Sequence, residues 1–545
     1  MKKNTTRKKQ KERQISFTGI CCCLFVFACV TGAVNSQNNT SKNPKVAQVH
    51  MLYADSFNME KEISPDAYIA RGNVVFLHDS TYMYCDSAYM YRNTNTLEAF
   101  SNVRIVQGDS LFIYGDYLTY LGNIRLAKMR QNVRMEHNDV TLFTDSFNYD
   151  RIKNIAYYFD GGMLVDSTNE LTSVYGQYLP ATKEATFRKD VQLLNEKMVL
   201  KSDTLKYWTE TKEALILGES VIESDSGIIY SSLGWYDTQT DDSKLYNRSL
   251  VVSKDGQKNL TADTLFYNQQ TGFGEAFGNM FLNDTTKKII LTGNYGWYND
   301  LAGMAMATDS AQCIEYSQGD TLFLHADTLR MFTVEEENSR LVKAYYGVRF
   351  YRTDLQGVCD SLQYNTADSV LRLFTDPVLW NAGYQLLGDT IHIYFNDSTI
   401  DRVHVLNYAF SVEKVDTGSY NQLKGNDLKA YFLSGELSQI HVSGNAETIY
   451  YPMEKDSTYI GMNYTQSGFF KIYVQNRQLN RMVIWPQPQG NTTPIPDLTP
   501  EAKSLKGFVL LDYLRPKDRY DIFIKVGRKQ EDIEVVPRKN DKFVY

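Results

Sequence analysis

One phrase recurs along this chain and limits what it can fold into. It has the pattern apolar-x-small-Asp-x-Leu-x-Tyr, and its clearest copies are Ile113–Tyr120, Leu142–Tyr149, Leu200–Tyr207 and Leu260–Tyr267. Weaker copies have their polar centres at Asp86, Gln177, Ser232, Asn294, Asp327, Asp360, Asp389 and Asn426. The centres lie about 30 residues apart over residues 70–450, which is typical of proteins that stack one small structural unit on the next.

A second phrase lies about midway between the centres. Its copies include Gly72–Val74, Ser101–Val103 and Gly278–Met280, and small residues of this kind indicate a corner or turn. Hairpin signals, such as the one at Gly122, fall between the two phrases. The chain has 39 Tyr and 27 Phe against 12 Pro and shows no sustained helical periodicity, so we predict an all-β fold with about two long strands per repeat.

The apolar positions change face at each centre. Around Asp116, the apolar Ile113 and the small Gly115 lie three and one residues before the centre, whereas Leu118 and Tyr120 lie two and four residues after it. A strand that keeps one face buried cannot make this change without an extra residue. We therefore predict a bulge or sharp bend at each centre, and two facing sheets joined along one edge as a folded trough.

Eight of the twelve centres are Asp, and rows of carboxylates also occur in calcium sites and in glycosidases. The other centres are Gln, Ser and Asn, which share with Asp only a polar side chain that can bond nearby backbone. This favours a bend-stabilising role for the whole column. Several centres also begin Asp-Ser/Thr-apolar triplets, such as Asp86–Ala88 and Asp203–Leu205, which resemble O-glycosylation sites of exported bacterial proteins.

Residues 1–36 are predicted to be a signal peptide. Seven bases and one acid within residues 1–13 precede an apolar run from about Ile15 to Val34, and cleavage is expected just before Gln37. A retained N-terminal membrane anchor and a lipoprotein site at Cys29 are the alternatives.

The charges, histidines and cysteines argue against several functional classes. The formal net charge is −7 even with the basic N-terminus, which disfavours nucleic acid as a partner. The seven His show no metal-ligand spacing, and no Gly-rich phosphate loop occurs. The three Cys outside the signal, Cys85, Cys313 and Cys359, form no metal pair or disulfide framework and are interpreted as small buried residues. We expect no catalytic residue, metal or cofactor.

The repetitive β domain is predicted to span residues 37–485, with its final degraded strand near Trp485. Five Pro residues between 486 and 500 indicate a linker over 486–505. Residues 506–545 are predicted to be a tail that either docks on a surface or stays loose.

The inner apolar columns have two possible roles. If the two sheets close tightly, the columns are simply core. If the sheets splay, the columns line a continuous groove suited to acyl chains, because each buried methylene contributes about 0.8 kcal/mol. The candidate lining residues are Ile113, Leu118, Tyr120, Leu142, Phe147, Leu200, Leu205, Tyr207, Leu260, Leu265, Tyr267, Leu291 and Leu324.

The half-phrases Gly-Asn-Val and Gly-Asp-x-Leu-x-Tyr, repeated after an export signal, resemble OstA-like proteins, the family of LptA and of the N-terminal domain of LptD. The resemblance covers about residues 45–485 and is clearest at 98–149, 198–223 and 385–450. It implies an elongated repetitive β-jellyroll, or β-taco, and a non-enzymatic periplasmic role, free or attached to either membrane. The implied activity is lipopolysaccharide transport during outer-membrane assembly.

The resemblance also implies partners. Lipid A acyl chains would contact the inner columns, and other Lpt-type transport components would join by strand addition at a terminal layer. The chain is longer than a typical LptA and has no room for the C-terminal barrel of LptD, which leaves open whether it is the bridge itself or an accessory. The main alternative is an exported structural or adhesin-like β-repeat protein, whose apolar columns would be fully sealed. A parallel β-helix enzyme and a membrane β-barrel fit the pattern less well.

Overall fold

The computed structural model describes residues 47–535, apart from residues 269, 300, 317–319, 335–338, 382, 397–398, 454–458 and 477. The predicted signal peptide, residues 1–36, lies outside the described residues. The chain divides into two units, Met1–Val46 and Ala47–Tyr545, and the described elements all belong to the second. No helix in this described part is long and apolar enough to span a membrane.

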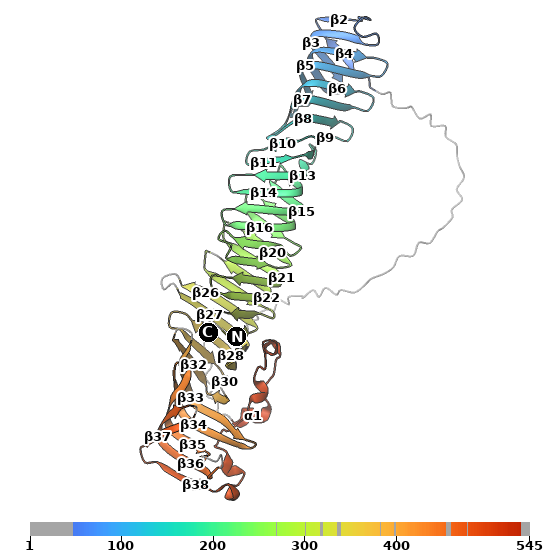
Figure 1. Cartoon of the computed structure of the whole chain (residues 1–545). Helices are drawn as coiled ribbons and strands as arrows, with labels where there is room; N and C mark the ends of the chain where they lie inside the picture. Colours follow the sequence, from blue (N-terminus) through green and yellow to red (C-terminus); the bar gives the residue numbers. More distant parts are fainter. Residues whose placement is uncertain are drawn as a thin grey trace, which may run out of the picture. The chain divides into compact units, whose positions relative to one another are not determined.

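The Ala47–Tyr545 unit is a stack of antiparallel strands that follow one another in chain order (Figure 1). The prediction of an all-β fold with about two long strands per repeat is confirmed. The continuous strands are β3 (Tyr68–His78), β4 (Thr81–Tyr91), β5 (Thr96–Gln107), β6 (Leu111–Leu121), β7 (Leu126–His137), β8 (Val140–Asp150), β13 (Glu184–Leu194), β14 (Met198–Trp208), β15 (Glu213–Ser224), β16 (Gly227–Asp237), β21 (Phe273–Asp284), β22 (Ile289–Asn299), β27 (Ser339–Tyr351), β28 (Leu355–Asn365), β33 (Thr399–Asp416), β34 (Ser419–Leu433), β35 (Glu436–Tyr450) and β36 (Met462–Gln475).

In the remaining layers the strand is divided into two short strands. These pairs are β1 (His50–Tyr53) and β2 (Ser56–Asn58), β9 (Ile155–Tyr158) and β10 (Gly162–Val165), β11 (Glu170–Ser173) and β12 (Tyr175–Leu179), β17 (Asp242–Leu245) and β18 (Leu250–Ser253), β19 (Lys258–Thr261) and β20 (Thr264–Asn268), β23 (Met304–Thr308) and β24 (Gln312–Glu315), β25 (Leu322–His325) and β26 (Thr328–Val334), β29 (Val370–Phe374) and β30 (Val378–Asn381), β31 (Tyr384–Leu387) and β32 (Thr390–Asn396), and β37 (Gln478–Trp485) and β38 (Gln489–Thr493). The helical turns are η2 (Ile495–Asp497), η3 (Glu501–Lys503), η4 (Asp512–Leu514), η5 (Asp521–Phe523) and α1 (Gln530–Val535).

The continuous strands bend near the middle, where their pairing shifts register. Pairing of β5 with β6 stops at Phe100↔Tyr117 and resumes at Val103↔Gly115, so two residues of β5 lie opposite Asp116. Similar shifts recur along the stack. An unequal number of residues on the two strands is a β-bulge, which bends and twists the strand. The predicted bend at the polar centres is therefore confirmed.

The two sequence phrases meet at this bend. In β5 the chain bends through two consecutive residues with positive φ, Ser101 (61°) and Asn102 (50°). Asn102 Nδ2 donates to Asp86 Oδ2 at 2.7 Å, and one repeat later Asn132 Nδ2 donates to Asp116 Oδ2 at 2.6 Å. The Asp of the first phrase thus accepts a hydrogen bond from the Asn of the second phrase on the next strand, in line with a bend-stabilising role.

Small residues precede the centres because the inner corner of the bend is narrow. A Cβ built on Gly115 would lie 2.7 Å from Met129 Cγ, and one on Gly425 would lie 2.4 Å from Val442 Cγ1. Both distances are below ordinary van der Waals contact, so a larger residue would displace the inner side chain of the neighbouring strand.

Each layer therefore folds over at the bend, and the turns at its two ends form two rows. Ion pairs join residues of the two rows, such as Arg125 with Asp79 and Lys212 with Asp139, so the rows face each other. We call the gap between the two rows of turns the mouth. The interior lies between the bend column and the mouth.

Apolar side chains fill the interior as two clusters. The first runs from Val49 to Tyr236 and the second from Leu245 to Ile472. Among the described residues, five partly exposed apolar side chains border the first cluster, whereas fifteen border the second. We call the layers around the first cluster the first stretch and the layers around the second cluster the second stretch. The interior is therefore packed more completely in the first stretch than in the second.

The three described cysteines are free thiols. Cys85 and Cys359 are buried, and burial raises the pKa of Cys85 to about 12. Cys313 is partly buried. The absence of a disulfide framework among the described cysteines agrees with the expectation from their spacing.

The C-terminal segment packs on the outer face of the second stretch. Successive side chains of a strand point to opposite faces, so Leu379 faces the interior while its neighbours Val378 and Trp380 face outward. The two outward side chains form a third apolar cluster with residues of the C-terminal segment, namely Leu505, Val509, Leu511 and Leu514. The segment predicted as a linker contains β38, η2 and η3, and η4, η5 and α1 follow it (Figure 1). Part of the predicted tail is thus docked on the protein's own sheet.

Three glutamines of neighbouring layers hold this C-terminal segment through its backbone and one arginine. Gln385 Nε2 donates to Val509 O at 2.9 Å, and its Oε1 accepts from Leu511 N at 2.8 Å. Gln422 makes the same kind of bonds to the backbone of residues 503 and 505, and Gln356 accepts from Arg515. The outer face of the sheet therefore fixes the segment at several layers.

Candidate functional site

The inner columns predicted from the repeat lie in the interior, but in two different settings. In the first stretch they are sealed, with at most 2% of each side chain exposed; these residues are Ile113, Leu118, Tyr120, Leu142, Phe147, Leu200, Leu205 and Tyr207. In the second stretch Leu265, Leu291 and Leu324 are buried, whereas Leu260 and Tyr267 are partly exposed.

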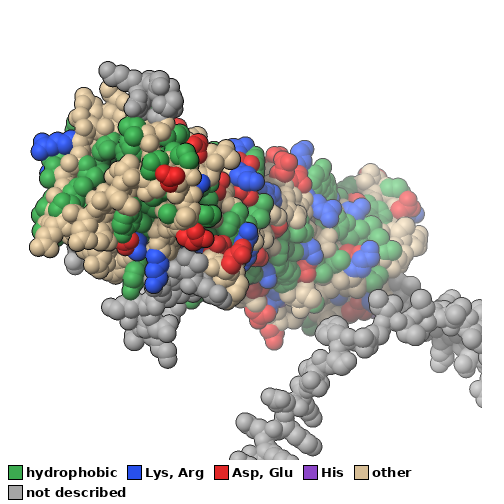
Figure 2. All heavy atoms as spheres, turned by 90° about the horizontal axis from the view of Figure 1, so that it is seen from below, with side chains coloured by type: hydrophobic (Ala, Val, Ile, Leu, Met, Phe, Trp, Pro, Cys, Tyr) green, Lys and Arg blue, Asp and Glu red, His purple; other side chains and the backbone are tan. Residues whose placement is uncertain are grey.

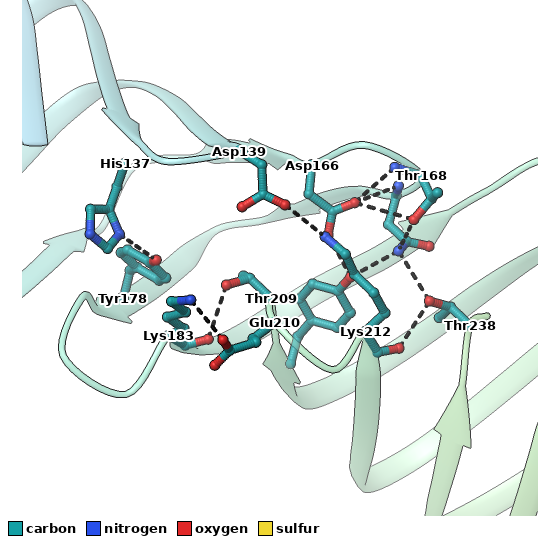
Figure 3. A network of polar contacts seen from close by, with 12 residues as sticks. His137, Asp139, Asp166, Thr168, Tyr178, Lys183, Thr209, Glu210, Lys212 and Thr238 are labelled. Carbon is teal, nitrogen blue, oxygen red and sulfur yellow. Dashed lines mark hydrogen bonds and ion pairs between the residues drawn. The ribbon is translucent and has the colours of Figure 1, made fainter. Parts of the chain in front are cut away.

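In the first stretch a polar network closes the mouth (Figure 3). Its centre is Lys212, whose Nζ lies 3.0 Å from Asp166 Oδ2 and 3.3 Å from Asp139 Oδ2. Asp166 also accepts a hydrogen bond from the Tyr207 hydroxyl, and Thr238 accepts one from Asn169. We call these contacts across the mouth the clasp.

The clasp continues in the neighbouring layers. Tyr120 OH lies 2.6 Å from His78 Nδ1 and accepts a hydrogen bond from Arg151 at 2.7 Å. His137 Nδ1 lies 2.8 Å from Tyr178 OH, as Figure 3 shows. Further along, an ion pair joins Lys197 to Asp241. Opposite edges of the mouth are thus joined in several consecutive layers.

The recurring Tyr of the repeat contributes the hydroxyl groups of the clasp. Tyr120, Tyr149, Tyr178, Tyr207 and Tyr236 recur every 29 residues, and each is at most 3% exposed. Each ring fills the interior while its hydroxyl group forms a hydrogen bond near the mouth. The repeat identified this column of tyrosines, but sequence reasoning assigned it only an apolar lining role. The hydroxyl group of each Tyr was the sequence feature that could have indicated the clasp.

Burial sets the protonation of the clasp. It raises the pKa of Tyr178 to about 12 and lowers the pKa of His137 below its ordinary value. Burial alone would raise the pKa of Asp166, but hydrogen bonds from Tyr207, Lys212 and backbone N–H groups outweigh it and lower that pKa. The clasp therefore holds neutral Tyr and His side chains beside an ionised Asp166.

In the second stretch the interior opens into an apolar cavity of about 190 Å³. It extends from β15 to β26, and its wall is mostly apolar side chains. The predicted residues in the wall are Leu260, Leu265, Tyr267 and Leu291. Sequence reasoning missed much of the rest of the lining, which includes Ile229, Met280, Leu282, Met306 and Met331.

A second apolar cavity, of about 180 Å³, lies further along the same interior. Leu355, Leu386, Ile440 and Val474 are among its lining residues. Partly exposed apolar side chains such as Cys313, Leu322 and Tyr364 border the interior in the layers that these two cavities reach. The unsealed interior therefore spans many layers of the second stretch.

The polar residues around the two cavities differ in charge. Two lysines and two carboxylates, Lys258, Lys287, Glu275 and Asp284, line the first cavity, whereas Glu413 and Glu436 line the second. A separate polar concavity of about 860 Å³ lies at the bend column beside Asp203 and is lined largely by serines, acids and amides. Most of its lining residues are polar, unlike those of the two apolar cavities.

Metal-binding side chains do not gather at one place in the described part of the chain. No group of three or more His, Cys, Asp or Glu there could hold a metal ion. The described Asp centres are spread along the bend, and Asp86 and Asp116 are engaged with asparagine side chains. What this interior offers is apolar surface.

Comparison with known proteins gives a family for the N-terminal part of the stack. A family model described as OstA-like protein matches residues 46–203. A search of curated proteins gave no match. Among solved structures, the crystal structure of LptH, described as the LptA homologous periplasmic component of the lipopolysaccharide transport device of Pseudomonas aeruginosa, is 14% identical. The match covers 24% of this chain and 95% of LptH, with a TM-score of 0.19. Over residues 46–203, this chain is similar to OstA-like proteins.

Proposed function

We propose that this protein is a non-enzymatic carrier that binds lipopolysaccharide in the periplasm and contributes to outer-membrane assembly. The observation that carries the proposal is the change along the interior, which is sealed as far as Tyr236 and bordered by partly exposed apolar side chains beyond it. Acyl chains suit such an interior because each methylene removed from water contributes about 0.8 kcal/mol. The OstA-like match gives the context of outer-membrane biogenesis.

The acyl chains of lipid A are proposed to occupy the second stretch. Leu260, Leu265, Tyr267 and Leu291 already line the first cavity. The sealed columns of the first stretch, such as Leu118 and Leu205, are proposed to take part only if the clasp opens. This division narrows the lipid-contact surface expected from the sequence.

Other Lpt-type components are proposed to join at the ends of the stack by strand addition. In the described residues β1 and β2 pair with β3 alone, and β37 and β38 pair with β36 alone, so the outer edges of these strands are open. Apolar side chains gather at the β38 end (Figure 2), including Leu479 and Trp485, which are 36% and 44% exposed. An open strand edge with apolar neighbours is suited to pairing with another chain.

The test is binding of purified lipopolysaccharide to the mature protein. Leu260→Asp places a charge in the wall of the first cavity, so we expect at least tenfold weaker binding with unchanged β content, as a buried carboxylate costs more than about 1.4 kcal/mol. Leu301→Asp is the matched control, because Leu301 is 74% exposed in a turn. Equal binding by wild type and Leu260→Asp would contradict the proposal.

A structural or adhesin-like spacer is the second candidate, and the sealed first stretch favours it. Photo-crosslinking in cells separates the two functions. A carrier should give lipopolysaccharide adducts from position 265 and few from position 205, because Leu265 lines the cavity and Leu205 is fully buried beside the clasp. A spacer should give no adducts at either position.

A further inference from the structure

Two lysines lie in the wall of the first cavity. Lys258 begins β19, and its Nζ lies 6.0 Å from the centre of the Tyr298 ring. Lys287 lies in the turn between β21 and β22, and 28% of its side chain is exposed. Both residues come from the same row of turns, so their ammonium groups flank the side of the cavity that faces the mouth.

The positive charge here is only partly neutralised. Lys287 Nζ lies 3.6 Å from Asp284 Oδ2, which is longer than a good charge-assisted hydrogen bond. Burial, followed by the neighbouring charge of Arg340, lowers the pKa of Lys287; Asp284 opposes this effect and Lys258 adds to it. Glu275, the other carboxylate in the cavity wall, accepts a hydrogen bond from Tyr295 at 2.7 Å. Asp255, whose pKa is lowered in part by the charge of Lys258, is a further carboxylate near that lysine. The cations Lys258, Lys287 and Arg340 therefore lie among carboxylates, and Asp284 is the one that forms an ion pair with a cavity lysine.

The other charged groups near the mouth behave differently. In the clasp, Lys212 has two carboxylates, Asp139 and Asp166, within 3.3 Å. At the second cavity, Glu413 and Glu436 are the charged lining residues. Of the two apolar cavities in the described interior, the first is thus the one whose wall also carries lysine side chains.

Resting on the proposed function, we infer that the first cavity binds amphiphiles that carry a phosphate group, with Lys258 and Lys287 as the phosphate ligands and Arg340 as a supporting charge. The acyl chains lie against Leu260, Met280 and Leu291. The phosphate lies at the mouth, where the ammonium groups donate to its oxygens and the crowding among the cations is relieved. The cavity thus selects its ligand by headgroup as well as by chain.

The experiment compares three probes on the full mature protein: bis-phosphorylated lipid A, the same lipid after phosphate removal, and inorganic phosphate alone. The variant is Lys258→Gln with Lys287→Gln. The control is Lys153→Gln with Lys201→Gln, which removes the same charge from exposed positions of the first stretch (72% and 57% exposed side chains). Circular dichroism checks the fold, and Lys258→Arg with Lys287→Arg restores the charge if glutamine disturbs it.

We expect the wild type and the control to prefer phosphorylated lipid A by about tenfold or more, as hydrogen bonds to charged groups are worth about 1.5–3 kcal/mol. The glutamine variant should lose this preference while its affinity for the dephosphorylated lipid stays the same, and the arginine variant should keep it. An unchanged preference in the glutamine variant overturns this inference alone. Tight binding of inorganic phosphate by itself also overturns it, because the site then needs no lipid. Failure of the wild type to bind either lipid overturns the proposed function as well.

Discussion

Lys212 and Asp166 form an ion pair of 3.0 Å in which the side chains are only 6% and 0% exposed, although they come from opposite edges of the mouth. The pair joins the two edges at the layers where the interior is sealed. Its burial makes it more than a surface contact, because a charge left without its partner there has no access to water.

Lys212→Met should therefore weaken the first stretch by about 3–5 kcal/mol, since it leaves Asp166 buried and unpaired. Urea unfolding can be followed by the fluorescence of Trp208 and Trp235, whose rings stack 5.0 Å apart in nearby layers. Lys183→Met is the control, because its pair with Glu210 is largely exposed (36% and 68%) and such pairs contribute about 0–1 kcal/mol. An equal loss of unfolding free energy in the two variants would contradict a larger contribution from the buried Lys212–Asp166 pair.

Acid should loosen the clasp. Burial lowers the pKa of His78 and of His137 in the folded protein. Stability is then complete above the unfolded pKa of about 6.5 and is lost as the pH falls below it, because the unfolded chain binds the proton more readily. Asp166, whose pKa is lowered, adds a further loss only near and below about pH 4.

The measurement is the urea midpoint at several values between pH 7.5 and pH 5, in wild type and in His137→Gln. The wild-type midpoint should fall with acidification, and His137→Gln should show a smaller fall because one of the buried imidazoles is gone. His50→Gln, at an exposed position of β1, should follow the wild type. A wild-type midpoint that rises towards pH 5 would contradict this account.

Asn132 should be a point of local weakness at the bend. Its φ is 51°, and its side-chain Nδ2 donates a hydrogen bond to Asp116. Its backbone N–H donates a hydrogen bond to Asp145 Oδ1 at 2.9 Å. Asn132→Ala loses the side-chain bond and puts alanine, which tolerates the left-handed conformation less well than asparagine, at a position with positive φ, for an expected cost of about 2 kcal/mol. Asn132→Gly keeps the conformation without that strain and should cost less.

Hydrogen exchange of the β6, β7 and β8 amides is the suitable measurement for Asn132, since it reports opening of a few layers rather than of the whole stack. Exchange should be fastest in the Ala variant, intermediate in the Gly variant and slowest in wild type. The same rate in the Ala and Gly variants would mean that the positive φ is not what makes the position demanding.

Gln385→Ala should release the C-terminal segment from the outer face. The side chain is only 5% exposed and bonds Val509 O and Leu511 N, which would both lose their partner. Limited trypsin digestion after Lys503 or Lys506 should become several times faster. Gln363→Ala, at a partly exposed position of β28, should leave the cleavage rate unchanged.

The repeat and the bend were predictable because residues close in sequence determine them. The change of parity from Gly115 to Leu118 lies within one strand, and an extra residue is the only way a strand can make it. The strand content, the small residues before the centres and the two joined sheets all follow from this local rule.

The difference between the sealed and open stretches was not predictable in the same way. The same phrase ends in Tyr207, which is fully buried, and in Tyr267, which is partly exposed. What separates them is whether polar residues meet across the mouth, as Lys212 does with Asp139 at a separation of 73 residues. Such a pairing follows from the stacking of several layers and cannot be found from one repeat.

The docked C-terminal segment has a consequence for the order in which the molecule forms. Most strands pair with their immediate neighbours in the chain, so layers can assemble one after another as the polypeptide is delivered from its N-terminus. The segment around Val509 instead bonds Gln385, which precedes it by 124 residues. This segment can dock only after those layers have formed, so its docking distinguishes a fully stacked molecule from a partly folded one.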